Sequence, residues 1–393
     1  MTAVRMRLPR DSRDDLLDSF HQAITIKYEV MRHLSYDALE RSLECTEDNE
    51  QQLRCPLLSR TPHVITLGNT LMSSHHESSS SAARSFTDPW NIAGIVSELQ
   101  RLRDDSLVKR LRVAKPVKLP SRDALAHVIE QLSAVLFPNR LGAPELAPES
   151  VDYFVGHTLD LALRELVRQV QRELRFVSMN SATASISETE LHDQASQIVQ
   201  EFSRTLPAIR EILDTDLQSA YEGDPAARSV DEVLVCYPGI TAIIHHRIAH
   251  QLYKLGVTLV ARIIAEIAHS STGIDIHPGA TISRSFFIDH GTGVVIGETA
   301  IIGERVRLYH GVTLGAKSFP VDENGALTKG NARHPIVESD VIIYAGATIL
   351  GRITIGKGSV IGGNVWLTRS CPPDSNISQA KLRGEDFVGG SGI

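Results

Sequence analysis

The spacing of hydrophobic positions changes near residue 274, and this change divides the chain into two kinds of structure. Before it, apolar residues recur at helical intervals of three and four. After it, aliphatic residues recur every six positions, which fits neither a helix nor a simple pair of strands. The pattern therefore predicts a helical part followed by a repeat structure.

Helical signals are sharp between residues 119 and 270. Ser121 precedes an apolar stripe that Pro138 ends, which is typical of a capped helix. Ser187 and Glu190 stand in capping-box positions before another such stripe. We predict an all-helical domain over residues 119–270.

The six-residue repeat covers most of the remaining chain. Its aliphatic positions are Ile276, Ile282, Ile288, Ile296, Ile302, Leu308 and Leu314, followed by Val337, Ile343, Ile349, Ile355, Ile361 and Leu367. This period is the signature of hexapeptide repeats, which coil into a three-sided, left-handed parallel β-helix with the aliphatic side chains inside. We predict the fold class α+β, with the β-helix over residues 271–383.

Two interruptions of the repeat are the places to look for chemistry. The step from Ile288 to Ile296 is eight residues long and contains Asp289 and His290. A loop of about twenty residues follows Leu314. Insertions in a solenoid must leave its stacked core, and such loops often carry function.

The two ends of the chain are less informative. For residues 1–118 we predict a variable, partly disordered extension. It has helical stretches around 15–27 and 91–113, with a Ser-rich tract between them. Residues 384–393 predict a short Gly-rich tail.

Composition excludes several classes of protein. The net charge of -7 argues against a general nucleic-acid binder. The 4 cysteines form no CxxC pair, so we expect neither a disulfide scaffold nor a Cys-rich zinc site. We find neither an apolar signal segment nor a run long enough to span a membrane, and expect a cytoplasmic protein.

Several motifs resemble the serine O-acetyltransferases of cysteine biosynthesis. They are GIDIHPGATISRSFFIDHGTGVVIGETAIIGE, then VTLGA and ARHP, and upstream AYEGDPAARSVDEVLVCYPGITAI. The resemblance covers about residues 119–370. It implies transfer of acetyl from acetyl-CoA to L-serine, giving O-acetyl-L-serine and CoA. It also implies that acetyl-CoA is a co-substrate, with no permanently bound cofactor and no metal.

Acyl transfer to a hydroxyl needs a base and a carboxylate that orients it. His290 lies in a repeat-breaking loop, and Asp275 precedes it by fifteen residues, a little under one coil. Residues about one coil apart are near neighbours in a solenoid. The resemblance makes His290 the general base and Asp275 the carboxylate that orients the imidazole.

The resemblance also implies the residues that hold serine and the inhibitor cysteine, namely Asp224, Asp289, Arg333 and His334. The chemistry fits, because an amino acid needs a cation for its carboxylate and an anion for its ammonium group. For acetyl-CoA, the family patterns TLGG and GAGA fall on Gly315, Ala316, Ala345 and Gly346, where this chain reads TLGA and YAGA.

The implied partners are copies of the chain and one other enzyme. We expect a homotrimer through the β-helix, or a dimer of trimers, with the active site between subunits. Some relatives end in Gly-Ile and insert the Ile into O-acetylserine sulfhydrylase, so Ile393 is a candidate contact. L-cysteine is the expected feedback inhibitor.

Other readings remain open at this point. The acceptor could be homoserine or a sugar, and the chain could be a non-catalytic regulatory scaffold for the sulfhydrylase. A γ-class carbonic anhydrase is rejected, because His310 lacks a second His about five residues away. We interpret Glu298 as structural. Without a carboxylate or Cys to complete a metal site, we place His245, His246 and His250 on a helix surface or at an interface.

Overall fold

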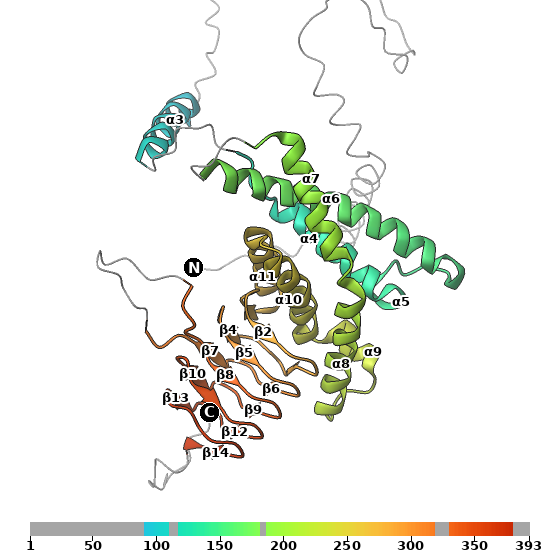
Figure 1. Cartoon of the computed structure of the whole chain (residues 1–393), viewed down its shortest axis with the longest axis vertical. Coiled ribbons are helices and arrows are strands. Elements are labelled where there is room, and N and C mark those ends of the chain that lie inside the picture. The colour runs from blue at the N-terminus through green and yellow to red at the C-terminus, as the bar shows by residue number, and fades with distance from the viewer. Residues whose placement is uncertain (1–89, 110–116, 181–185, 319–329, 380–393) are drawn as a thin grey trace, which may run out of the picture. The chain divides into compact units, whose positions relative to one another are not determined.

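The computed structural model describes residues 90–109, 117–180, 186–318 and 330–379, in which helices precede parallel strands (Figure 1). The helices are α3 (Ile92–Lys109), α4 (Arg122–Leu136), α5 (Pro138–Leu141), the 3-10 turn η1 (Pro148–Ser150), α6 (Val151–Asn180), α7 (Glu188–Ser203), α8 (Leu206–Gly223), α9 (Val230–Cys236), α10 (Pro238–Lys254) and α11 (Thr258–Thr272). Among the described residues, no helix combines the length and hydropathy that crossing a membrane requires.

The strands are short and regularly spaced. They are β1 (Asp275–Ile276), β2 (Thr281–Ile282), β3 (Phe287–Ile288), β4 (Val295–Ile296), β5 (Ile301–Ile302), β6 (Arg307–Leu308), β7 (Thr313–Gly315), β8 (Ile336–Val337), β9 (Ile342–Ile343), β10 (Thr348–Leu350), β11 (Thr354–Ile355), β12 (Val360–Ile361), β13 (Trp366–Leu367) and β14 (Asn376–Ile377). This order confirms the predicted fold class, α+β, with a helical region followed by a three-sided parallel β-helix.

The sequence signals for helix ends are confirmed where the structure describes them. The Ser121 side chain accepts a hydrogen bond from the N–H of Ala124 at the start of α4. Ser187 and Glu190 form a complete capping box at the start of α7. The helical stretch predicted around 91–113 contains α3, whereas the stretch around 15–27 and the Ser-rich tract lie outside the described residues.

A carboxylate from α6 caps the start of α11. Glu173 accepts hydrogen bonds from the N–H groups of Leu259 and Val260, both at 2.8 Å. Burial raises the pKa of the Glu173 carboxyl, although these backbone bonds oppose the rise. The N-terminus of a helix favours a negative charge, so this contact fastens α6 to α11.

Every third strand stacks into one of three parallel sheets. Sheet A contains β1, β4, β7, β10 and β13, sheet B contains β2, β5, β8 and β11, and sheet C contains β3, β6, β9, β12 and β14. Asp275 pairs with Val295, a step of 20 residues, whereas Val295 pairs with Thr313, a step of 18. The two extra residues of the first coil lie in the loop that contains His290.

We call the turn from sheet C to sheet A the C–A corner, and the turn from sheet A to sheet B the A–B corner. Along the C–A corner, Gly293, Gly311 and Gly346 stack with φ angles of 81°, 67° and 70°. A Cβ atom added at Gly293 would lie 3.5 Å from the Cα of Gly311. Glycine adopts such left-handed backbone at little cost, so successive coils pack closely here.

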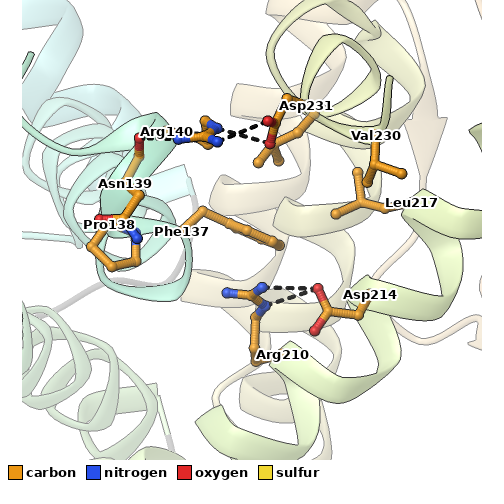
Figure 2. A pocket seen from close by; sticks show the side chains of 10 residues that line it. Phe137, Pro138, Asn139, Arg140, Arg210, Asp214, Leu217, Val230 and Asp231 are labelled. Carbon is orange, nitrogen blue, oxygen red and sulfur yellow. Dashed lines mark hydrogen bonds and ion pairs between the residues drawn. The ribbon is translucent and has the colours of Figure 1, made fainter. Parts of the chain in front are cut away.

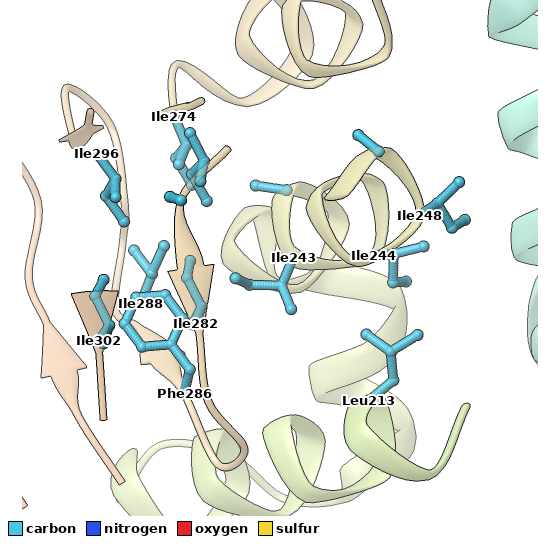
Figure 3. Packing of buried hydrophobic residues seen from close by; sticks show 14 of the residues in the cluster. Leu213, Ile243, Ile244, Ile248, Ile274, Ile282, Phe286, Ile288, Ile296 and Ile302 are labelled. Carbon is cyan, nitrogen blue, oxygen red and sulfur yellow. The ribbon is translucent and has the colours of Figure 1, made fainter. Parts of the chain in front are cut away.

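The hydrophobic core continues from the helices into the first coil (Figure 3). Leu213 of α8 and Ile243 and Ile248 of α10 belong to the same buried cluster as Ile282 and Phe286 of the β-helix.

The domain limits remain predictions. We expected an extension over residues 1–118, a helical domain over 119–270, the β-helix over 271–383 and a tail over 384–393.

A buried ion pair joins α8 and α10 to the β-helix. The Arg247 guanidinium lies 3.1 Å from the carboxylate of Asp216. It also donates to the carbonyl oxygens of Ile282 and Ser283, while Asp216 accepts from the N–H of Phe286. Burial raises the pKa of Asp216 to about 6, against the lowering effect of Arg247.

The prediction that the histidines of α10 lie on the helix surface was wrong for His245 and His246. His245 and His246 are only 8% and 2% exposed. Helices α8 and α11 and strand β3 all pack against α10, so no wide face of this helix remains open. Burial lowers the pKa of His246 well below its ordinary value, and neither of its ring nitrogens has a hydrogen-bond partner among the described residues.

Candidate functional site

The residues that the sequence analysis selected lie mainly at the two corners that border sheet A. Those at the C–A corner are Asp289, His290, Ala345 and Gly346. Those at the A–B corner are Gly315, Ala316, Arg333 and His334. Asp275 begins β1 of sheet A, and Asp224 follows the end of α8. Ile393 lies outside the described residues.

The C–A corner brings His290 close to acidic groups. His290 Nδ1 lies 3.7 Å from Asp289 Oδ1, and its side chain is 71% exposed. The ring also meets the His310 ring edge-on, with 5.8 Å between centroids. Its own φ of 59° and the positive φ of Gly291 turn the loop out of the coil. The loop thus presents an open imidazole beside a carboxylate.

Asp224 reaches the same corner from α8 and is held by two hydrogen bonds. One carboxylate oxygen accepts from the N–H of Ala226 at 2.8 Å, and the other accepts from the hydroxyl of Tyr237. The Tyr237 bond holds the pKa of Asp224 below its usual range, and the nearby charge of His290 acts in the same direction. The same bond raises the pKa of Tyr237 to about 12. Asp224 is therefore a fixed anion near His290.

At the A–B corner, Arg333 is held by an acidic partner. Its guanidinium lies 2.7 Å from Glu298, and the hydroxyl of Tyr253 on α10 donates to the other oxygen of Glu298 at 3.0 Å. Burial opposes ionisation of Glu298, but these bonds outweigh it and hold the pKa below its usual range. Its other terminal nitrogen donates to the carbonyl oxygen of Asn331 at 3.3 Å. A guanidinium has five N–H donors, so donors remain for a carboxylate ligand.

His334 is buried and fixed in one tautomer. Its ring packs on Gly297, where an added Cβ would collide with it. Thr299 donates to Nδ1 from its backbone N–H at 3.1 Å and from its hydroxyl at 2.9 Å. Burial, followed by the charge of Arg333, lowers the pKa of His334 to about 4. Because Nδ1 accepts hydrogen bonds, the neutral ring carries its proton on Nε2 and can donate from there.

Thr299 also holds the backbone of both A–B corner residues. Its hydroxyl oxygen accepts from the N–H of Arg333 at 2.9 Å and from that of His334 at 3.1 Å. We expect Thr299→Val to raise KM for the acceptor about tenfold, because it leaves these polar groups unpaired. Initial rates at saturating donor would measure it.

The matched control is Thr299→Ser, which keeps the hydroxyl and loses only a methyl group. It should stay close to the unaltered protein in KM. Equal effects of both substitutions would show that packing of the methyl group, and not the hydrogen bonds of Thr299, positions this corner.

The titratable neighbours of Asp275 differ from those of His290. Its carboxylate lies within 4.8 Å of ligand atoms on Glu266 and His269, both from α11. Among the described residues, the close ionic contact of His290 is with Asp289. The pairing of Asp275 with His290 therefore stays a prediction. Glu266 is also paired with Arg262 at 3.1 Å, and we infer no metal site from this group.

Sequence reasoning missed the supporting residues Tyr237, Tyr253 and Thr299. Tyr237 carries one available signal, because Tyr-Pro marks the start of the second helix after the GDPA turn. Thr299 follows Glu298, which we had interpreted as structural and which is the partner of Arg333. The contact of Thr299 with His334 crosses the loop between β7 and β8, so its register is not readable from spacing alone.

A cavity of about 230 Å³ lies away from these residues (Figure 2). It is lined by α5, α8 and α9, with Arg140 paired to Asp231 and Arg210 paired to Asp214. The Arg210 guanidinium also stacks over the Phe137 ring at 4.1 Å. Its charged groups satisfy one another, so the cavity is not our candidate site.

Comparison with known proteins first defines a class. Residues 334–369 match the family model described as bacterial transferase hexapeptide (six repeats). Together with the three-sided coil, this match makes the chain a hexapeptide-repeat transferase.

Individual relatives define the family. A Synechococcus elongatus protein named serine acetyltransferase, plasmid, is 56% identical over 304 residues, covering 77% of this chain and 95% of that protein. The solved Entamoeba histolytica serine acetyltransferase 1 in complex with L-cysteine is 36% identical with a TM-score of 0.56, covering 67% of this chain and 88% of that one. Isoform 3 from the same organism, in complex with cysteine, is 32% identical with a TM-score of 0.56, covering 76% and 96%. The chain belongs to the serine acetyltransferase family.

Proposed function

We propose that the protein transfers the acetyl group of acetyl-CoA to the hydroxyl of L-serine, giving O-acetyl-L-serine and CoA. This is the first step of cysteine biosynthesis from serine. The observation that carries the proposal is the 56% identity to a serine acetyltransferase over 95% of that relative's length. The exposed imidazole at the C–A corner, beside two carboxylates, supports it.

In the proposed mechanism, His290 acts as the general base. It takes the proton from the serine hydroxyl as that oxygen attacks the thioester carbonyl. The tetrahedral intermediate then collapses and the C–S bond breaks. The imidazolium returns its proton to the departing CoA thiolate, so His290 ends in its starting state. An adjacent carboxylate, which the resemblance assigns to Asp275, stabilises the imidazolium.

Serine would be held at its two charged ends. Asp224 and Asp289 suit the ammonium group, and Arg333 with the Nε2–H of His334 suits the carboxylate. The two Entamoeba relatives were solved with cysteine, an amino acid of the same shape. We therefore propose L-cysteine as an inhibitor that competes for this site.

The proposed site needs two subunits. Asp289 lies at the C–A corner and Arg333 at the A–B corner, with one face of the coil between them. A face of about six extended residues spans roughly 15–20 Å, which is longer than serine. We infer that a neighbouring subunit supplies the second corner, as a trimer of parallel β-helices allows.

Acetyl-CoA would occupy the groove between the same two corners. Gly315 ends β7 and Ala316 follows it at the A–B corner, while Ala345 and Gly346 precede β10 at the C–A corner. At these four positions a small side chain or none leaves room for acetyl-CoA to lie close to the backbone of the coil. Pairing of trimers into hexamers, binding of the sulfhydrylase through Ile393 and a cytoplasmic location remain predictions.

Thiol release from acetyl-CoA tests the proposed function. We expect L-serine to accelerate release at least about tenfold over the rate without acceptor, and L-cysteine to compete with L-serine. L-homoserine and an amino sugar serve as comparison acceptors. Faster release with either of them would assign a different acceptor, and no response to any acceptor would remove the activity.

A further inference from the structure

The C–A corner carries two parallel rows of side chains. One row, from coil to coil, is Asp289, Tyr309, Tyr344 and Gly362. The adjacent row is His290, His310, Ala345 and Gly363. Backbone hydrogen bonds fix the first row. The N–H of Asp289 donates to the carbonyl oxygen of Leu308, the residue before Tyr309, and the N–H of Tyr309 donates to that of Ile343, the residue before Tyr344. The proposed serine end and the proposed acetyl-CoA end of the site therefore lie on one strip, two coils apart.

Two tyrosines fill the row between these ends. The Tyr309 and Tyr344 rings are stacked, with centroids 5.0 Å apart and 14° between their planes. Tyr344 is 41% exposed. The next position of the row is Gly362, which has no side chain to cover Tyr344. A planar apolar surface is thus left open beside Ala345 and Gly346.

We propose that Tyr309 and Tyr344 form the floor on which the pantetheine arm of the acetyl donor lies. This inference rests on the proposed function, because it takes the thioester to be at His290. Strands of neighbouring coils are about 4.8 Å apart, so Tyr344 lies roughly 10 Å along the axis from Asp289. The middle of an extended pantetheine arm reaches that far from the thioester sulfur.

The chemistry of the two tyrosines fits this occupant. The pantetheine arm is uncharged and alternates methylene groups with planar amides. Aromatic faces pack on both, and a tyrosine hydroxyl can donate a hydrogen bond to an amide carbonyl. A charged phosphate group would instead require basic side chains, which neither ring supplies.

Three acetyl donors of different length test the proposal with Tyr344→Ala. They are acetyl-CoA, S-acetylpantetheine, which lacks the nucleotide, and S-acetyl-N-acetylcysteamine, which lacks most of the arm. We expect kcat/KM to fall about tenfold for the first two donors and to stay unchanged for the shortest. KM for the acceptor should not change.

Two further variants serve as controls. Tyr344→Phe keeps the ring and should remain within about twofold of the unaltered protein. Tyr153→Ala removes an exposed tyrosine of α6 and should change nothing. Equal losses for all three donors, or a loss confined to acetyl-CoA, would overturn the proposal. Normal turnover by Tyr344→Ala with every donor would also overturn it while leaving the proposed function intact.

Discussion

Replacing His290 with alanine is expected to lower kcat by about 10²–10⁴-fold, the usual contribution of a general base. The fold should survive, because the side chain is 71% exposed and its loop lies outside the stacked core. Thiol release from acetyl-CoA in the presence of L-serine measures the effect. Size-exclusion chromatography and circular dichroism would show whether the assembly and helix content are unchanged.

His127→Ala is the matched control, because this histidine lies on the outer face of α4 with a side chain 79% exposed. It should keep full activity. Asp275→Asn and Asp289→Asn, compared with each other, would show which carboxylate supports the imidazole, since only Asp289 makes an ionic contact with it in the described part of the chain. A His290→Ala protein that retained more than about a tenth of kcat would remove the proposed mechanism.

Replacing Arg247 with methionine is expected to lower the free energy of unfolding by about 3–5 kcal/mol, because it leaves the buried carboxylate of Asp216 without a counter-charge. Urea denaturation at one fixed protein concentration would measure it, since assembly also contributes to stability. Loss of the bonds to the carbonyl oxygens of Ile282 and Ser283 adds to the effect.

The effect should depend on pH. Arg247 lowers the pKa of Asp216, so its removal raises the folded-state pKa above the present value of about 6. The folded variant then holds a proton that the unfolded chain has released, so the loss should be larger at about pH 8 than at about pH 5.

The double variant Arg247→Met with Asp216→Asn serves as the control, because it removes the uncompensated charge. It should recover part of the stability and lose the pH dependence. A single variant as stable as the unaltered protein at every pH would contradict the assigned role of the ion pair.

Local signals predicted much of the fold. Ser121 and Ser187 mark helix starts because their caps form within the same turn of chain. The six-residue grid predicted the coil because each aliphatic residue stacks on its counterpart in the next coil, whatever lies outside. The burial of His246 was not predictable in this way, because it depends on helices and a strand that pack around α10 from distant parts of the sequence.

The candidate site could be predicted only in part, because some of its contacts join parts of the chain that carry no local sequence signal. Asp289 and His290 stand out because they interrupt a regular period. The bond from Tyr237 to Asp224 and the bonds from Thr299 to His334 join segments whose separation is set by turns and loops of arbitrary length. Such contacts follow no period in the sequence, so they are found only in the three-dimensional structure.

The separation between the buried aliphatic row and the corner rows has an evolutionary consequence. Tyr309 and Tyr344 each follow a buried residue of the repeat, but neither helps to fill the interior. Mutations at such outward positions cost little stability. Natural selection can therefore change the preference for donor or acceptor one coil at a time, while the interior of the β-helix stays the same.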